Sequence, residues 1–429
     1  MKRVLLLATT TGYQTRSFGD AARKLGVQLV FATDRCDQLE DPWWDQAIPI
    51  RFHEEDQSVR AILDATGGDP LAGVLAVGDR PTRLAARVAD RLNLPGNPLE
   101  AADASRNKWA FRTAISEARL PGPWFRSLPI DTDPAVAARD LSYPCVIKPL
   151  ALSGSRGVIR ADDAAGFVVA FDRVRRLLAS ADVQAEREPS SGAMLVEGFI
   201  PGREFALEGL LQGGRLRTLA IFDKPDPLDG PFFEETIYVT PSGLSDEDQA
   251  RVGDAVAAAA GALGLRHGPV HAECRVNDTG VFVLEVAARP IGGLCSRALR
   301  FVTTDALRLG DPEARGGGEA SLEEVLLRHA LGDDVEGYVR EPGASGVMMI
   351  PIPRRGVFRG VSGLDAARAV KDVEDVHITA KVDQVLVPLP EGKSYLGFIF
   401  ARSLTPDAVV AALREAHARL AFTIERALM

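Results

Sequence analysis

A β-hairpin between Gly268 and Gly293 is the feature that most constrains the fold of this chain. Two apolar runs flank the turn Asn277-Asp278-Thr279-Gly280, and the two-residue period of a strand decides which side chains share a face. Glu273 precedes the turn and Glu285 follows it, both within apolar strands where a lone buried carboxylate is costly. The pattern therefore predicts a shared cation, and Mg²⁺ bridging triphosphate oxygens to one or two carboxylates fits it.

Arg289 follows Glu285 by four residues. It keeps the same strand parity, so the two side chains are expected to point the same way. Arg289 is then placed to hold a reacting carboxylate and the oxyanion that develops from it, with the backbone N–H of Gly292 as a second donor. The alternative is a salt bridge between Arg289 and one of the two glutamates.

A second segment, CVIKPLALSGSRGV, places Lys148 on a strand and follows it with a loop rich in glycine and serine. In such a loop backbone N–H groups approach anionic oxygens closely, hydroxyls add donors, and a lysine neutralises charge. The loop residues are Ser153, Gly154, Ser155, Arg156 and Gly157. A plain hairpin turn is the competing interpretation.

The segment MLVEGFIPGREFALEGLL carries two further carboxylates. Glu197 ends an apolar strand, and the backbone around Phe199 and Ile200 is available to a planar base edge. After a Pro-Gly turn, Glu204 can accept two hydroxyl hydrogens, as a ribose diol requires. Two charged residues on an edge strand are the competing interpretation.

Two more charged segments are candidates for the site. Ser105 is expected to cap a helix with Lys108 in its first turn, where the lysine is either solvated or part of the site. Between Pro231 and Tyr238, Glu234 or Glu235 could pair with a substrate ammonium, or both belong to an acidic surface loop. Lys224, just before, either steadies a phosphate or is solvated.

The order of these segments predicts several domains. The first hundred residues alternate apolar runs, at 4–8, 27–32 and 74–77, with helical stretches such as 82–92, which is typical of βαβ units on a small parallel sheet. The turn after the first run, Thr9 to Tyr13, lacks the spaced glycines of a dinucleotide site. We expect a surface loop at 180–192 and a flexible connection at 310–320.

A last module is expected to begin near Ser345. Its predicted strands are 347–352, 376–379, 385–389 and 395–401, and a helix begins at Pro406. These elements describe a small α+β domain.

Composition narrows the class of protein. A net charge of -9 over 429 residues argues against a general nucleic-acid coat, and no apolar stretch is long enough to span a bilayer. The four cysteines lie far apart without a CxxC pair, which favours a reducing, cytoplasmic setting over a disulfide framework or a cysteine zinc site. His271 shares the strand parity of Glu273, and either lines the site or packs within the sheet.

In this order, the segments resemble the ATP-grasp superfamily. The resemblance implies α/β and α+β architecture: an N-terminal parallel-sheet (pre-ATP-grasp) domain at 1–96, an ATP-grasp domain at 97–310 with a lid at about 128–200, and a small C-terminal α+β domain at 320–429. It implies that ATP is bound by Lys108, Lys148, Ser153, Gly154, Ser155, Gly157, Glu197, Phe199, Ile200 and Glu204, and Mg²⁺, or Mn²⁺ in its place, by Glu273 and Glu285.

Within that superfamily, EVAARPIGG, FDKPDPLDGPFFEETIYVTPS and SYLGFIFARS are similar to the bacterial L-amino acid ligases that make dipeptides. The resemblance implies an acyl phosphate formed with ATP, displacement of phosphate by a second amino acid, and release of ADP and phosphate. It assigns catalysis to Arg289 and Gly292 and substrate binding to Glu235, Arg289 and Gly293. Ala287 departs from the pattern, because many relatives carry an asparagine there, which leaves open whether one or two magnesium ions bind.

Two other functions remain open at this point. One is a bicarbonate-activating enzyme of the biotin-carboxylase kind, and the other is a nucleotide-binding protein without turnover. The expected partners are small-molecule amino-acid substrates, with no nucleic acid and no membrane, and homodimerisation is left open.

Overall fold

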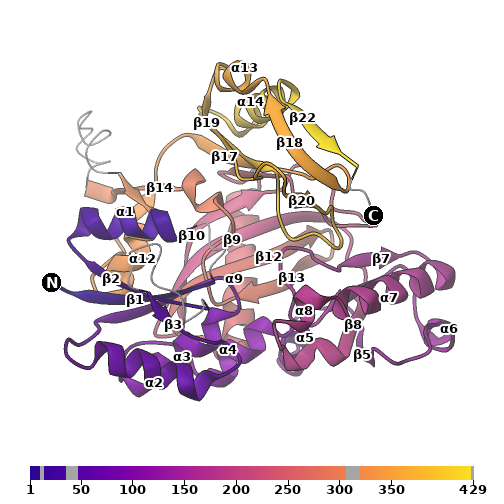
Figure 1. The fold of residues 1–429 in the computed structure, drawn as a ribbon, viewed down its shortest axis with the longest axis horizontal. Coiled ribbons are helices and arrows are strands. Elements are labelled where there is room, and N and C mark those ends of the chain that lie inside the picture. The colour runs from indigo at the N-terminus through magenta and orange to yellow at the C-terminus, as the bar shows by residue number, and fades with distance from the viewer. Residues whose placement is uncertain (10–13, 35–46, 306–318, 427–429) are drawn as a thin grey trace.

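The computed structural model describes residues 1–9, 14–34, 47–305 and 319–426. Within these ranges the strands form five sheets, of which the largest has eight strands and crosses the middle of the molecule (Figure 1). Most of the predicted connection at 310–320 and most of the turn at 9–13 lie outside the described residues. Among those residues, no helix is both long and apolar enough to cross a lipid bilayer.

The N-terminal region is the predicted parallel sheet. Its strands run β3-β2-β1-β4, and every pairing in it is parallel. Alternate residues of β1 pack in opposite directions: Leu5 and Leu7 lie in one apolar cluster with Ile62 and Leu84, and Leu6 lies in another. The elements are β1 Arg3–Ala8, α1 Thr15–Leu25, β2 Gln28–Thr33, β3 Ile48–Pro49, α2 Glu55–Thr66, β4 Gly73–Val77 and α3 Pro81–Arg91.

The predicted lid is a four-stranded antiparallel sheet in the order β5-β8-β6-β7, covered by α7. The stretch 180–192, expected to be a loop, instead contains a short helix and a 3-10 turn. The elements of this part are α4 Leu99–Arg106, α5 Lys108–Glu117, β5 Phe125–Pro129, α6 Pro134–Ala137, β6 Cys145–Pro149, β7 Ile159–Ala161, α7 Ala164–Leu178, α8 Ala181–Gln184 and β8 Ala193–Gly198.

The eight-stranded sheet is antiparallel throughout, in the order β13-β12-β9-β10-β11-β17-β21-β19. The last three of these strands come from the C-terminal module, so that module continues the central sheet rather than forming a sheet entirely of its own. The strands, with the helix that packs on them, are β9 Arg203–Gln212, β10 Arg215–Asp223, β11 Ile237–Thr240, α9 Asp246–Leu263, β12 Gly268–Asn277, β13 Gly280–Ala287, β17 Ala344–Ile350, β19 Val373–Ile378 and β21 Gly397–Ser403.

Two small sheets complete the fold, β15-β14-β16 and β20-β18-β22. Strands β18 and β22 were not predicted, and the predicted strand at 385–389 is limited to two residues. The remaining elements are β14 Arg300–Thr303, β15 Ala320–Ser321, α12 Leu322–Ala330, β16 Tyr338–Arg340, β18 Gly356–Ser362, α13 Leu364–Arg368, β20 Val385–Leu386, α14 Pro406–Ala418 and β22 Ala421–Glu425.

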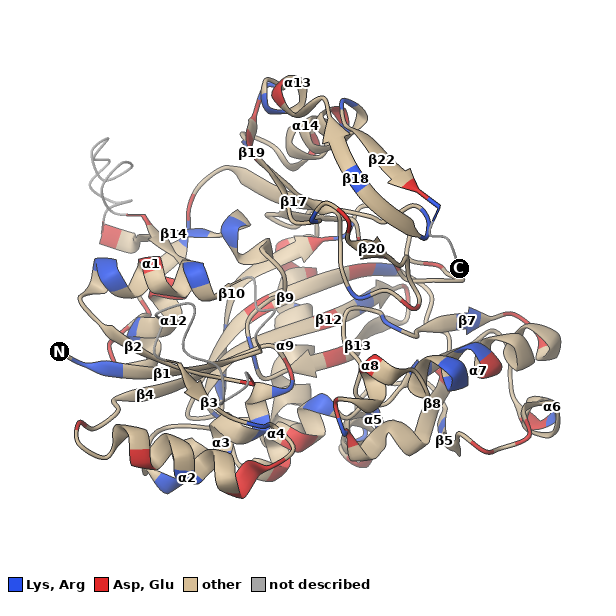
Figure 2. Ribbon diagram, in the orientation of Figure 1, with Lys and Arg blue, Asp and Glu red and all other residues tan. Residues whose placement is uncertain are grey.

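Charged residues of both signs are interspersed on the helices. Figure 2 shows acidic and basic residues close together on α2 and α7, where salt bridges such as that between Asp172 and Arg175 join them. A mixed distribution of this kind argues against a polyanion-binding face on these helices.

Candidate active site

A cavity of about 820 Å³ lies where the N-terminal sheet, the lid, the central sheet and the C-terminal module meet. Residues from all four parts line it, among them Asp79, Lys148, Glu273 and Tyr395. Of the predicted site residues only Gly157 is not part of the lining. Those that line the cavity are Lys108, Lys148, Ser153, Gly154, Ser155, Glu197, Phe199, Ile200, Glu204, Glu235, Glu273, Glu285, Arg289, Gly292 and Gly293.

The two carboxylates of the predicted metal pair lie opposite each other. Glu273 on β12 and Glu285 on β13 are register partners in the antiparallel pair, and both side chains line the cavity. Directly opposed residues of an antiparallel pair share a face and bring their side chains close. The ammonium of Lys108 lies 3.4 Å from Glu285 Oε2. Two acids and a lysine therefore converge from different elements.

A second carboxylate cluster surrounds Lys224. Its Nζ lies 2.8 Å from Glu204 and 3.1 Å from Glu273, and it also contacts Glu235. Burial alone lowers the pKa of Lys224, but the three carboxylates more than offset it and raise that pKa well above its usual value. The interpretation of Lys224 as a solvated lysine is therefore wrong.

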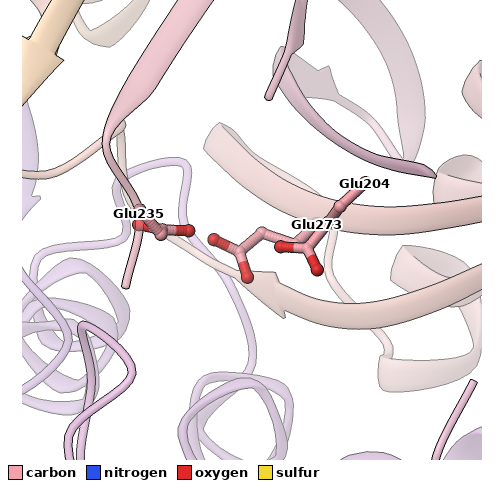
Figure 3. Close-up of side chains that lie close together, drawn as sticks. All are labelled: Glu204, Glu235 and Glu273. Carbon is pink, nitrogen blue, oxygen red and sulfur yellow. The ribbon is translucent and has the colours of Figure 1, made fainter. Parts of the chain in front are cut away.

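The same three acids could hold a metal ion. Figure 3 shows Glu204, Glu235 and Glu273 directed toward one another, and ligand oxygens of all three lie within 4.8 Å of each other. Hard carboxylate oxygens suit Mg²⁺. This cluster includes Glu273 of the predicted pair, but it contains Glu204 and Glu235 instead of Glu285. The single Lys224 ammonium offsets only one of the three carboxylate charges of this cluster. In the predicted pair Glu273 also faces Lys224, while Glu285 faces Lys108, so both sets of acids keep carboxylate oxygens for a cation.

The Glu235 side chain is only 13% exposed and does not belong to a solvated acidic loop. Its carboxylate accepts a hydrogen bond from the Tyr238 hydroxyl at 2.8 Å, besides its contact with Lys224. Burial raises the pKa of Glu235 to about 7, although Lys224 pulls it down. Glu234, its neighbour, does not line the cavity.

Arg289 is held by a residue that the sequence analysis missed. Its Nε and Nη2 donate to the two carboxylate oxygens of Asp79 at 2.9 and 3.2 Å. Burial lowers the pKa of Arg289, and the Asp79 carboxylate more than compensates and raises it. The strand does not extend to Arg289 as expected, since β13 ends at Ala287, but Glu285 and Arg289 both line the cavity. The alternative interpretation predicted a salt bridge from Arg289 to Glu273 or Glu285. Arg289 does form a salt bridge, but its partner is Asp79.

Asp79 follows β4 at the carboxyl edge of the parallel sheet. Ligands of open α/β sheets bind outside the carboxyl ends of the strands. That rule, applied to the predicted strand at 74–77, is the signal by which Asp79 could have been found.

Glu197 is engaged by two cations. Arg112 donates to it from Nε at 2.5 Å and from Nη2 at 3.1 Å, and Lys148 Nζ lies 2.6 Å from Oε1. Burial raises the pKa of Glu197, but Arg112 and Lys148 outweigh it and lower that pKa to about 2. The carboxylate therefore fixes Lys148. Phe199 and Ile200 line the cavity, but the Phe199 N–H donates to Pro144 O at 3.0 Å and the Ile200 carbonyl accepts from Arg275 Nη1 at 2.7 Å.

The helix that carries Lys108 begins differently from the prediction. Asn107, not Ser105, is its N-cap, and the Asn107 side chain accepts hydrogen bonds from the N–H groups of Trp109 and Ala110. Lys108 is in the first turn, as expected, and its Nζ donates to the carbonyl of Leu152 at 2.8 Å. The lysine thus reaches the start of the glycine-rich loop.

That loop connects the antiparallel strands β6 and β7, so it is a hairpin turn that also lines the cavity. Gly154, Ser155 and Gly157 all have positive φ. The C-terminal module holds the loop from outside: Gly157 N–H donates to Pro390 O at 2.8 Å and Arg156 Nε to Glu391 O at 2.8 Å.

His271 lies between two acids. Its Nδ1 contacts Glu208, and its Nε2 lies 3.7 Å from Glu273. Burial lowers the pKa of His271, but Glu208 outweighs this and raises it to about 9. The side chain lines the cavity and is buried in the sheet, so both interpretations of His271 hold.

Comparison with known proteins matches three family models along the chain. The ATP-grasp N-terminal domain matches residues 19–96, the ATP-grasp domain 141–298, and the L-amino acid ligase C-terminal domain 2 residues 348–425. These matches, together with a solved structure of the same fold, confirm the expected fold class.

One solved structure and two curated relatives extend the comparison. The crystal structure of L-amino acid ligase from Bacillus licheniformis covers 99% of both chains at 25% identity and a TM-score of 0.81. The uncharacterized protein y4rH of Sinorhizobium fredii is 24% identical over 94% of this chain and 79% of its own. Alanine–anticapsin ligase of Bacillus subtilis is 25% identical over 56% of this chain, and the match spans 53% of that ligase.

Proposed function

Because this chain is an ATP-grasp protein with the C-terminal domain of the L-amino acid ligases, we propose that it joins two amino acids, or amino-acid-like substrates, by an ATP-dependent amide bond. The carboxylate of one substrate attacks the γ-phosphorus of ATP, the bond to ADP breaks, and an acyl phosphate forms. The ammonium of the second substrate gives up one proton, the free amine attacks the acyl carbon, phosphate leaves with the bridging oxygen, and the nitrogen loses a second proton to solvent.

One observation carries the proposal: Glu273 and Glu285 face each other at the cavity that Arg289 also lines. Phosphoryl transfer depends on positioning and charge neutralisation more than on a protein nucleophile. Carboxylates for a cation, lysines for phosphates and a guanidinium for the substrate carboxylate are the groups that this chemistry needs.

The donor set fits magnesium. Glu273 and Glu285 offer carboxylate oxygens on adjacent strands, and these residues would hold the ion, whereas Ala287 offers no side-chain ligand. When bound, Mg²⁺ supplies neutralisation of charge on the phosphate oxygens.

Residues of the chain perform the remaining tasks. Lys148, fixed by Glu197, and Lys108 neutralise phosphate charge from two sides. Arg289, fixed by Asp79, orients the substrate carboxylate, and the Gly292 N–H donates to the oxyanion. Glu235, an acid in the lining of the cavity that also contacts Lys224, receives the ammonium of the amine substrate.

Bicarbonate activation of the biotin-carboxylase kind is disfavoured. The matched C-terminal domain is of the L-amino acid ligase type, and its residues Met349, Tyr395 and Phe398 reach into the cavity. Apolar and aromatic side chains suit an organic substrate better than a small hydrated anion. ATP turnover that requires bicarbonate and no amine would reverse this preference.

A nucleotide-binding protein without turnover is the other alternative. A guanidinium buried against Asp79 and still lining the cavity is not needed for nucleotide binding alone. Nucleotide binding without hydrolysis in the presence of any amino-acid pair would favour this alternative.

The test is a matrix of paired L-amino acids incubated with ATP and Mg²⁺, with ADP and phosphate measured in each well and products identified by mass. The proposal predicts ADP and phosphate only in wells that contain both a competent acid and a competent amine. Formation of AMP and pyrophosphate would refute the acyl-phosphate mechanism.

A further inference from the structure

The main-chain N–H and carbonyl of Ile291, here called the Ile291 peptide, are each held by a buried side chain. Glu208 Oε2 accepts the N–H of Ile291 at 3.1 Å, and Gln14 Nε2 donates to the carbonyl of Ile291. Glu208 and Gln14 are each 2% exposed. They come from β9 of the central sheet and from the N-cap of α1, so two separate parts of the fold meet at one residue.

Such contacts fix orientation strongly. A hydrogen bond to a carboxylate is about twice as strong as one between neutral groups, and the low dielectric of a buried site strengthens it further. The Ile291 N–H belongs to the peptide group shared with Pro290, and the Ile291 carbonyl belongs to the one shared with Gly292. With both engaged, neither peptide group can rotate without leaving a buried polar group unpaired.

Glu208 also connects this peptide to the carboxylate cluster. Its other oxygen contacts His271 Nδ1, and His271 Nε2 faces Glu273 at 3.7 Å. One buried carboxylate thus sets the position of the loop after β13 relative to the predicted metal ligand on β12.

The neighbouring residues of the loop are constrained too. Asp79 holds Arg289 on the N-terminal side of the peptide. On the other side the ring of Phe398 lies against Gly293, where an added Cβ would come within 3.1 Å of it. The direction of the Gly292 N–H then depends on the Ile291 peptide, the remaining part of the loop.

We infer that Glu208 and Gln14 are positioning residues, which hold the Ile291 peptide so that the Gly292 N–H and the Arg289 guanidinium point into the cavity. The inference rests on the proposed function, because it gives those two donors a task in the reaction. It assigns to the N-terminal domain, through Gln14, a direct part in ordering the site.

A purely structural role would predict a different outcome. If Glu208 and Gln14 only stabilised the packing, their loss would lower stability without changing turnover by the folded enzyme. The variants Gln14→Ala and Glu208→Gln separate the two cases, since Glu208→Gln keeps the shape of the side chain and removes the charge next to His271.

Thr66→Val is the matched control. Thr66 is a buried residue of the same N-terminal domain, and its Oγ1 donates to the carbonyl of Ile62 at 2.7 Å within α2. The substitution removes one buried hydrogen bond at nearly constant shape, away from the cavity lining.

The first readout is hydrogen–deuterium exchange on the full-length protein without substrates. We expect faster exchange at the Ile291 amide in Gln14→Ala and in Glu208→Gln, and wild-type exchange there in Thr66→Val. Unchanged exchange in both Gln14→Ala and Glu208→Gln would overturn the inference, whether or not any amino-acid pair is turned over.

The second readout is turnover with an amino-acid pair taken from the matrix, together with binding of ATP. We expect kcat to fall by up to about 100-fold in both variants, the effect of a misplacement of about 1 Å, with ATP affinity unchanged. Faster exchange combined with wild-type kcat would also overturn the inference. If no pair is turned over by the wild type, the proposed function fails, while the exchange result still decides whether these side chains hold the peptide.

Discussion

Glu273 and Glu285 are register partners across β12 and β13, and both line the cavity where the four parts of the protein meet. The pairing continues past a bulge, because Cys274 pairs with Val283 rather than with Leu284. A bulge re-aims a side chain locally and is common next to active sites. Here it lies directly beside the two carboxylates.

Replacing either acid should remove the metal-dependent step. We expect Glu273→Gln and Glu285→Gln each to lower kcat/KM by more than about 100-fold, since loss of an outer-shell partner of a metal ligand already costs about 10- to 100-fold. The measurement is ADP formation as a function of Mg²⁺ concentration. Glu234→Gln is the control, because Glu234 lies outside the cavity lining. Wild-type activity in either test variant would contradict the assignment.

Arg289→Ala should separate chemistry from nucleotide binding. Loss of an oxyanion donor costs about 10²- to 10³-fold in kcat, and the predicted nucleotide contacts of Lys108 and Lys148 remain. The measurement compares kcat for ligation with the Kd for ATP. Parallel loss of both would show that Arg289 serves the nucleotide instead.

The same variant should lose stability, because it leaves Asp79 without its buried partner. Removing one member of a buried ion pair costs about 3–5 kcal/mol. The free energy of unfolding in urea measures this loss. In the double variant Asp79→Asn with Arg289→Ala, part of the stability should return while activity does not; equal stability of the single and double variants would exclude this explanation.

Stability should fall in acid partly through Glu197. Its pKa is lowered from 4.5 to about 2 in the folded protein, despite burial, by Arg112 and Lys148. A group whose folded pKa is depressed stabilises the fold above its unfolded pKa, and a difference of one between the two pKa values corresponds to about 1.4 kcal/mol. That contribution is present at neutral pH and is lost as pH falls from about 5 toward 2.

Urea unfolding across that acidic range tests this pH dependence. Glu197→Gln should be less stable than wild type at neutral pH, because Arg112 is left buried without its partner, and should lose less stability on acidification. Equal slopes in the two proteins would show that other carboxylates account for the acid sensitivity.

Two glycines of the loop between β6 and β7 should respond differently to alanine. At Gly157, with φ +75°, a Cβ would lie 2.6 Å from Pro149 Cγ and 2.9 Å from Leu177 Cδ2, whereas at Gly154, with φ +63°, no atom lies within 4 Å. Both substitutions carry the left-handed backbone cost of about 1–2 kcal/mol, and Gly157→Ala adds an overpacking cost of about 1–3 kcal/mol. Thermal unfolding of the two variants measures the difference, and equal Tm values would contradict it.

Local patterns predicted the elements that depend on local sequence. The parallel sheet follows from apolar runs that are buried on both faces, as in β1. The hairpin that pairs Glu273 with Glu285 follows from two alternating runs around one turn. The two hairpin strands are adjacent in sequence, and each strand of the parallel sheet carries its own apolar run, which is why a local pattern suffices.

Contacts between distant segments were not predictable in the same way. The partner of Arg289 is Asp79 in another domain, and the side chain that fixes Glu197 is Arg112 on α5. Nothing in the spacing of these residues specifies such pairs. Likewise β11 pairs with β17, which joins the C-terminal module to the rest of the central sheet. That pairing depends on how the two parts of the chain pack together.

The N-cap of α5 was predicted at Ser105 instead of Asn107 for a local reason. Ser105 and Asn107 are both good N-cap residues, and the break between α4 and α5 decides between them. Ser105 donates instead to the carbonyl of Ala102 inside α4. The helix boundary, rather than the residue type, was the missing information.

The most direct test of the proposed ligation follows an oxygen atom. An amino acid with a heavy-oxygen-labelled carboxylate is incubated with ATP, Mg²⁺ and the amine substrate that gives ADP in the matrix, and the released phosphate is examined by mass spectrometry. Formation of an acyl phosphate predicts that one labelled oxygen passes from the carboxylate into the phosphate as the amide forms. Phosphate without label, in a reaction that still makes the amide, would contradict the account.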